Sequence, residues 1–203
     1  MRGWSAHQGT AVALDRESID TDQLIPARFM VTPRAAGYGR FLLHDLRYDA
    51  NGTAVPDFPL NRHPHASVLV TRRNFGSGSS REAAVYALVD FGLRVILAPS
   101  FGDIFAANAV NNGLLPARVE STDAILDALF KGPLPARADL ETQTVTVGDI
   151  SLPFQIDAAW REKLINGWDD IDLTRAHHAD IADFRTVRER AAPWVFAHKT
   201  TEP

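Results

Sequence analysis

The residues best placed to do chemistry lie in one glycine-rich stretch, residues 71–82, which reads TRRNFGSGSSRE. The stretch places a hydroxyl, Ser79, two positions before a cation, Arg81, and its glycines, Gly76 and Gly78, let the backbone approach a ligand closely. Free amides at the start of a helix attract anions, and an arginine adds a planar fork for a carboxylate or phosphate. The pattern indicates an anion site.

A strand and a helix must position this stretch. Residues 67–70 are apolar and partly β-branched, which predicts a buried strand. After the stretch, Val85, Leu88 and Val89 recur at helical spacing, and Gly92 stands where a helix commonly ends. The expected local structure is therefore a strand, a glycine-rich turn and a helix.

The start of that helix can be read in two ways. Ser79 and Glu82 have the spacing of a capping box, so Ser79 is the expected N-cap. Arg81 would then lie in the first turn, where the helix dipole disfavours cations unless an anion is bound. The alternative is that Ser79 only caps the helix and Arg81 is solvated. The stretch lacks the Gly-Lys pair of a phosphate loop and the third glycine of a dinucleotide fingerprint.

Composition limits what the chain can be. Its 203 residues are 45% apolar, which suits one folded domain, and the net charge of −4 argues against a nucleic-acid surface. No stretch is apolar enough for a membrane helix and the N-terminus lacks a signal-peptide core, so a cytoplasmic location is expected. The chain has no cysteine, which excludes a disulfide scaffold, a thiolate nucleophile and a cysteine-held iron–sulfur cluster in this polypeptide.

Strands and helices alternate through the first two thirds of the sequence, and a group of strands follows. This order predicts an α/β fold with one continuous core over residues 1–203, extended by C-terminal helices from about residue 157. Thr174 is the candidate cap of the last helix, and Ser100 and Asp103 have capping spacing before another. The expected strands cover residues 10–14, 67–70, 94–98, 138–140, 144–147 and 151–156; the expected helices cover 41–48, 83–91, 104–112, 121–131 and 157–166, and then a last one to about residue 190.

Residues 75–82, FGSGSSRE, resemble the active-site signature of the swivelling domain of the aconitase superfamily, and the length and later motifs are similar to bacterial 3-isopropylmalate dehydratase small subunits. The resemblance implies a swivelling β/β/α domain. It implies Ser79 as general base, Arg81 as a ligand of a substrate carboxylate, and Ser80 and Gly78 as neighbouring substrate contacts. Ala83 departs from the family pattern, which usually has histidine there.

The same resemblance extends to two earlier segments. Asp20-Thr21-Asp22, otherwise explained as a loop that caps its own backbone, matches an Asp-Thr-Asp whose acids border the active site; Asp22 is the catalytic candidate. The glycine- and proline-containing segment 27–40 is expected to read the substrate and to bring a second arginine to a carboxylate. Arg34 is the candidate and Arg28 its rival.

The resemblance also implies cofactor and partner. The family's dehydration chemistry uses a [4Fe–4S] cluster, which this chain cannot hold, so a large iron–sulfur subunit would carry it in a heterodimer or larger complex. The implied activity is that of a hydro-lyase of leucine biosynthesis, which acts on a small hydroxy dicarboxylic acid and has no nucleic-acid or membrane partner. A related dehydratase for homoaconitate, citraconate or a dimethylmalate-like acid stays open, as does a non-catalytic paralogue that kept the fold.

Overall fold

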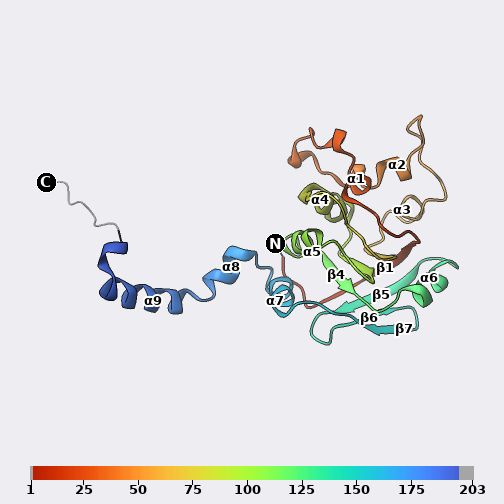
Figure 1. The fold of residues 1–203 in the computed structure, drawn as a ribbon. Coiled ribbons are helices and arrows are strands. Elements are labelled where there is room, and N and C mark those ends of the chain that lie inside the picture. Colours follow the sequence, from red (N-terminus) through yellow and green to blue (C-terminus); the bar gives the residue numbers. More distant parts are fainter. Residues whose placement is uncertain (1, 197–203) are drawn as a thin grey trace. The chain divides into compact units, whose positions relative to one another are not determined.

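A seven-stranded mixed sheet organises the first part of the chain (Figure 1). The strand order is β4-β3-β2-β1-β5-β6-β7; β1 to β4 are parallel, and β5 to β7 continue as antiparallel neighbours. Because the carboxyl ends of parallel strands share one edge, the loops after β1, β2 and β3 gather there. The strands are β1 (Ala6–Leu14), β2 (Val68–Thr71), β3 (Val95–Ala98), β4 (Leu115–Arg118), β5 (Leu134–Asp139), β6 (Thr144–Val147) and β7 (Ile150–Pro153).

The computed structural model describes residues 2–196, which divide into two compact units between Trp168 and Asp169. The helices of the first unit are α1 (Thr21–Leu24), α2 (His44–Arg47), α3 (Pro59–Arg62), α4 (Glu82–Phe91), α5 (Asp103–Asn111), α6 (Asp123–Leu129) and α7 (Ala158–Asn166). The second unit contains α8 (Asp170–Arg175) and α9 (His178–Ala191), and short 3₁₀ turns occur at Ala27–Phe29, Arg34–Ala36, Gly39–Phe41 and Pro193–Val195.

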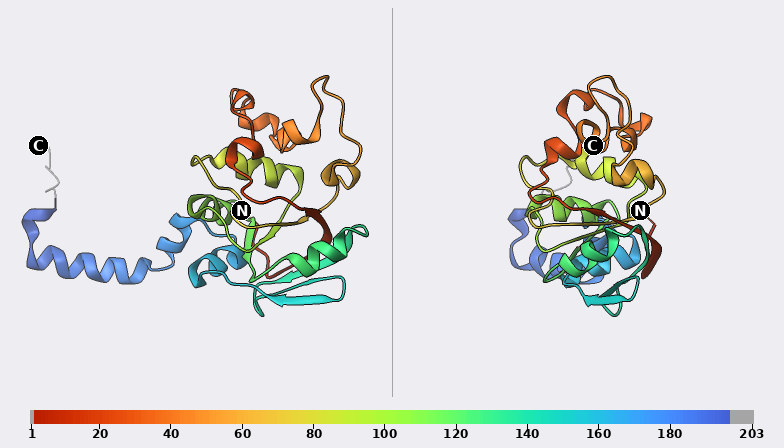
Figure 2. Two further views of the ribbon diagram at one scale, coloured as in Figure 1. Left: turned by 45° about the vertical axis from the view of Figure 1, so that its right-hand side comes forward. Right: turned by 90° about the vertical axis from the view of Figure 1, so that its right-hand side faces the viewer.

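Apolar side chains cover both faces of the parallel strands. Successive residues of a strand point to opposite faces, so Leu69 joins one buried cluster and Val68 and Val70 join another. The first cluster packs against α1 to α4. The second packs against α6 and the antiparallel strands β5 to β7, and these lie on the opposite side of the parallel strands from α1 to α4 (Figure 1, Figure 2). Burial of β2 and β3 on both faces explains their continuous apolar sequence.

Most expected elements form, but several differ. The strand β4 and the short helix α3 lie where none was expected, and of the expected helix 41–48 only His44–Arg47 is α-helical. β1 begins at Ala6 rather than at residue 10, because its first half pairs antiparallel with β5. Residues 21–24 form a short helix instead of a loop. The last predicted helix is divided: Asp169, not Thr174, caps α8 through a capping box with Asp172, and α9 follows as a separate helix.

Candidate active site

The loops that follow β1, β2 and β3 meet at the carboxyl edge of the parallel strands. The glycine-rich stretch is the loop after β2, and it lies between the loops after β1 and β3. The Gly76 N–H donates to the Ile19 carbonyl at 2.7 Å, and the Thr21 N–H donates to the Ser77 carbonyl at 3.0 Å. On the other side, the Gly102 N–H donates to the Phe75 carbonyl at 2.9 Å. Backbone bonds therefore fix the turn to the loops that follow β1 and β3, as expected for a rigid site.

Two glycines give this turn its shape for different reasons. Gly76 has φ +73°, and a Cβ there would lie 2.2 Å from Cγ of Phe105. Gly78 has φ +92°, but the nearest atom to its added Cβ would be 3.5 Å away. At position 76, glycine is required both by the left-handed backbone and by the close packing against the Phe105 ring. At position 78, only the left-handed backbone requires glycine.

Ser79 is exposed and lines a cleft of about 210 Å³ together with Thr21, Gly78, Arg81 and Phe105. Its carbonyl accepts a hydrogen bond from the Thr21 hydroxyl at 2.8 Å, which fixes the backbone at this residue. Its own hydroxyl has no hydrogen-bond partner among residues 2–196. The serine is held by its main chain while its oxygen stays available to a ligand.

The expected N-cap at Ser79 is wrong. The helix begins at Glu82, so Arg81 occupies the N-cap position, and no side chain there bonds to the first turn. The capping-box spacing placed the N-cap at Ser79, but the backbone stays irregular for two more residues, up to Arg81. The helix does end at Gly92, as predicted, with a left-handed glycine. The Ser79 hydroxyl is consequently not occupied by capping.

Arg81 forms an ion pair with Asp22, and this pair lies beside the cleft. The Arg81 side chain is 21% exposed and that of Asp22 is 56% exposed. Asp20 has a different task, because it caps α1: it accepts from the Gln23 N–H at 2.7 Å and the Gln23 side chain bonds back at 3.1 Å. Of the two acids, only Asp22 pairs with the cation of the cleft.

The two candidate arginines of segment 27–40, Arg34 and Arg28, lie away from the cleft in this structure. Arg34 donates two hydrogen bonds to Asp90, at 2.6 and 2.8 Å, and lies 4.3 Å above the ring of Tyr86. Asp90 is eight residues after Glu82, about 12 Å along α4. Arg28 pairs with Asp45. The structure therefore joins Ser79, Arg81 and Asp22, but not Arg34 or Arg28.

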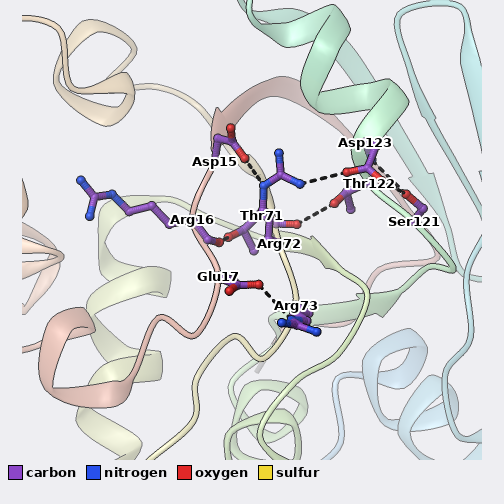
Figure 3. A network of polar contacts seen from close by, with 9 residues as sticks. All are labelled: Asp15, Arg16, Glu17, Thr71, Arg72, Arg73, Ser121, Thr122 and Asp123. Atoms are coloured by element: carbon purple, nitrogen blue, oxygen red, sulfur yellow. Dashed lines mark hydrogen bonds and ion pairs between the residues drawn. The ribbon is translucent and has the colours of Figure 1, made fainter.

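A polar network that the sequence did not indicate holds the residues just before the turn (Figure 3). Arg72 pairs with Asp15 and, at 3.0 Å, with Asp123, while Arg73 pairs with Glu17 at 2.9 Å. The network links the end of β2 to the loop after β1 and to the start of α6. These arginines precede Ser79 in the motif, yet their charges are used for anchoring, and nothing in the sequence indicated which acids they pair with.

The block that begins at Ser100 supports the site rather than capping α5. The Ser100 hydroxyl accepts from the Asn74 N–H at 2.8 Å, and Gly102 is the N-cap of α5, so the predicted capping role of Ser100 is wrong. Phe105, Asp103 and Ile104 line the same cleft as Ser79. The apolar ring of Phe105 and the exposed side chain of Asp103 thus belong to the site.

No group of three metal-ligating side chains occurs within the part of the chain that the structure describes. Together with the absence of cysteine from the whole sequence, this means that the residues present do not fit an iron–sulfur cluster. None of the helices within residues 2–196 has the length and apolar character that crossing a bilayer requires.

The fold and the turn define the class of the protein. The family model described as the aconitase C-terminal domain matches residues 1–122, more than half of the chain. A crystal structure of 3-isopropylmalate dehydratase from Methanocaldococcus jannaschii has the same fold, with a TM-score of 0.66 at 23% identity over 88% of this chain and 98% of that one. The expected swivelling β/β/α domain of the aconitase type is therefore confirmed.

Curated relatives narrow the assignment further. The chain is 43% identical to the 3-isopropylmalate dehydratase small subunit of Halalkalibacterium halodurans, over 93% of this chain and 100% of that protein. It is 43% identical to the small subunit of Geobacillus kaustophilus (91% and 96% covered) and 41% identical to that of Bacillus subtilis (93% and 97% covered). The chain belongs to the family of 3-isopropylmalate dehydratase small subunits, as its glycine-rich motif indicated.

Proposed function

We propose that this chain is the small subunit of a hydro-lyase that interconverts 2-isopropylmalate and 3-isopropylmalate by dehydration and rehydration, in leucine biosynthesis. Family membership supports the reaction. The observation that carries the assignment of the site is the unpaired, exposed hydroxyl of Ser79 beside Arg81, in a cleft at the start of α4. The large subunit is the proposed partner, and the proposed compartment is the cytoplasm.

Ser79 is proposed as the base that removes the carbon-bound proton of the substrate. Serine is a weak base, so its alkoxide must be stabilised by hydrogen bonds and nearby positive charge. The turn supplies the free amide end of the α4 dipole and the guanidinium of Arg81. The bond from Thr21 to the Ser79 carbonyl holds the serine in place while leaving its hydroxyl unused. Proton transfer by such a positioned group contributes about 10²–10⁴ in rate.

Arg81 is proposed to bind a substrate carboxylate, with Ser80 and the backbone at Gly78 as further donors. Without substrate, the Asp22 carboxylate forms an ion pair with the Arg81 guanidinium. A substrate carboxylate would displace or share that position, and Asp22 would then stay close to the reacting atoms, where it orients Arg81. The planar fork of arginine suits this contact, because two parallel bonds fix the direction of the carboxylate.

Arg34 remains the proposed ligand of a second carboxylate, but this role requires a movement. Its two bonds to Asp90 must break, and the segment 27–40 must approach the cleft from the far end of α4. The Tyr38 N–H also donates to Asp90, at 2.7 Å, so one acid holds the segment twice. Binding of the large subunit or of the substrate would supply the free energy for this release.

The [4Fe–4S] cluster of the family's chemistry is proposed to belong to the large subunit. This chain has no cysteine to bind one. Its own residues bind the carboxylates, keep the substrate oriented and move the proton. The reaction is therefore proposed to occur where the Ser79 cleft faces the partner, and only in the assembled enzyme.

The test is an assay of the co-purified pair of subunits on 3-isopropylmalate, homoaconitate, citraconate and a dimethylmalate. We expect the highest kcat/KM on 3-isopropylmalate and no activity of either subunit alone. A preference for another acid would move the assignment to a related dehydratase. A stable pair that is inactive on all four would favour a non-catalytic paralogue, in which Ala83 replaces the usual histidine.

A further inference from the structure

A cavity of about 440 Å³ lies at the end of α4 that is far from Ser79, where residues 36–40 meet the ends of α2 and α4. It belongs entirely to the first unit of the chain. The residues that line it include two arginines, one acid and two aromatic residues: Arg40, Arg47, Asp90, Tyr48 and Phe91. Neither arginine has a part in the proposed reaction, so the cavity calls for a separate explanation.

Arg47 is a buried cation that has no acid to pair with. It is 7% exposed, and among residues 2–168 its hydrogen bonds go to neutral acceptors. Nε donates to Oδ1 of Asn61 at 2.9 Å, and Nη1 donates to the Leu42 carbonyl at 3.2 Å. A buried charge without an opposite charge is costly, and burial lowers the pKa of Arg47, although a guanidinium stays protonated at pH 7. The surroundings of Arg47 therefore lack a negative charge that a bound anion would supply.

One nitrogen of this guanidinium opens into the cavity. Nη2 of Arg47 has no hydrogen-bond partner among residues 2–168. Every buried side-chain nitrogen or oxygen within residues 2–196 has such a partner, so an atom without one is accessible. Arg47 lines the cavity, and its Cζ lies 4.9 Å above the ring of Phe91, which lines the cavity too. The accessible nitrogen is therefore a donor that a ligand in the cavity can reach.

Arg40 adds a second cation to the same cavity. It is exposed, its Cζ lies 4.7 Å above the ring of Phe41, and no acid among residues 2–168 pairs with it. Asp90 does not cancel these charges, because both of its oxygens accept hydrogen bonds from Arg34. The C-terminal end of the α4 dipole adds only a partial negative charge. The cavity is therefore positive, with one cation fixed by burial and one exposed.

We propose that this cavity binds a small oxyanion with two negative charges, of the phosphate type. Oxyanions accept short, charge-assisted hydrogen bonds from a guanidinium. A phosphate group carries about −1.5 to −2 charges at pH 7, which matches two arginines better than the single charge of a carboxylate does. The site is separate from the Ser79 cleft, since the two share no lining residue. The inference does not depend on the proposed reaction.

The test is a titration of the full chain with inorganic phosphate, followed by NMR of the backbone amides at an ionic strength held constant with chloride. We expect saturable shifts of the amide signals of Gly39, Tyr48 and Phe91, which line the cavity. Acetate, which carries a single charge, should bind more weakly than phosphate. The inference is overturned if no shift at the cavity saturates, if the shifts are confined to the Ser79 cleft, or if acetate binds as tightly as phosphate.

Variants of three arginines show which cations bind the phosphate. Arg40→Gln should raise the dissociation constant about tenfold, because it removes one charge-assisted contact. Arg62→Gln is the matched control: Arg62 on α3 is also exposed and has no acid partner among residues 2–168, and its loss should leave the constant unchanged. Arg47→Lys keeps a charge but loses the planar fork, and it should abolish saturable binding.

Arg40→Gln decides the question even where Arg47→Lys does not fold, because Arg40 is exposed. Equal dissociation constants for the wild type and Arg40→Gln would overturn the inference. An equal loss in Arg40→Gln and Arg62→Gln would overturn it as well, since phosphate would then respond to the overall charge of the protein and not to this cavity.

Discussion

Substituting Gly76 by alanine perturbs the turn at the point where it is packed most tightly. The added methyl would meet Cγ of Phe105 at 2.2 Å and both Cδ atoms at 2.6 Å. Phe105 has little room to move, because it is 3% exposed and its ring packs edge-on against Phe75 with centroids 5.3 Å apart. The backbone at residue 76 also has φ +73°, which an alanine adopts only at a cost.

Two terms set the size of the effect. The left-handed backbone costs about 1–2 kcal/mol for a residue with a Cβ, and overpacking costs about 1–3 kcal/mol. The expected loss in the free energy of unfolding for Gly76→Ala is therefore about 2–5 kcal/mol. Gly78→Ala is the matched control: its φ is +92°, but nothing lies within 3.5 Å of the new methyl, so only the backbone term of about 1–2 kcal/mol applies.

Urea unfolding followed by circular dichroism measures the free energy of unfolding for the wild type, both alanine variants, the single variant Phe105→Leu and the double variant Gly76→Ala/Phe105→Leu. The smaller leucine should recover part of the overpacking term, so the double variant should lose less than the sum of its single changes. Equal losses for Gly76→Ala and Gly78→Ala would refute the packing explanation, as would additive losses in the double variant.

Three further predictions concern charged groups. Arg81→Lys should lower kcat and raise KM of the assembled enzyme, because lysine lacks the planar fork; unchanged kinetics would mean a solvated side chain. Arg34→Ala should raise KM about tenfold, whereas Asp90→Ala, which releases Arg34, should not; equal effects would show that Arg34 only anchors its segment. The hydrogen bond from Arg28 lowers the pKa of Asp45 to about 2, so Asp45→Asn should slightly lower the free energy of unfolding at pH 7. Urea unfolding should show this difference from the wild type disappearing as pH falls from about 4 through 2, because the wild-type carboxylate is then protonated. A difference that does not change with pH would contradict the pairing of Asp45 with Arg28.

Local patterns predicted the strand, turn and helix around Ser79 because the necessary information is local. Continuous apolar residues indicate a buried strand, and the terminal glycine Gly92 indicates the end of α4. The same local rule failed at Ser79, since a capping box is only a spacing and long-range backbone bonds to Ile19 and Phe75 hold the turn irregular up to Arg81.

Contacts between distant residues could not be read from the sequence. Arg34 and Asp90 are 56 residues apart, and neither carries a pattern that indicates the other. The position of Arg81 at the start of the helix singled it out in the motif, but only the folded chain shows that Arg72 and Arg73 pair with acids of the loop after β1 and that Arg81 pairs with Asp22. The chemistry of the site was accessible from residue types, whereas the partner of each charge was not.

The most direct test of the proposed role of Ser79 is the dehydration rate of the reconstituted pair of subunits with Ser79→Ala. The expected result is a loss of turnover by about 10²–10⁴ with unchanged assembly and fold, because the variant lacks only the oxygen that takes the proton. Ser151→Ala, an exposed serine on β7, should keep wild-type turnover. Near-normal turnover of Ser79→Ala in the assembled enzyme would contradict the assignment of Ser79 as the base.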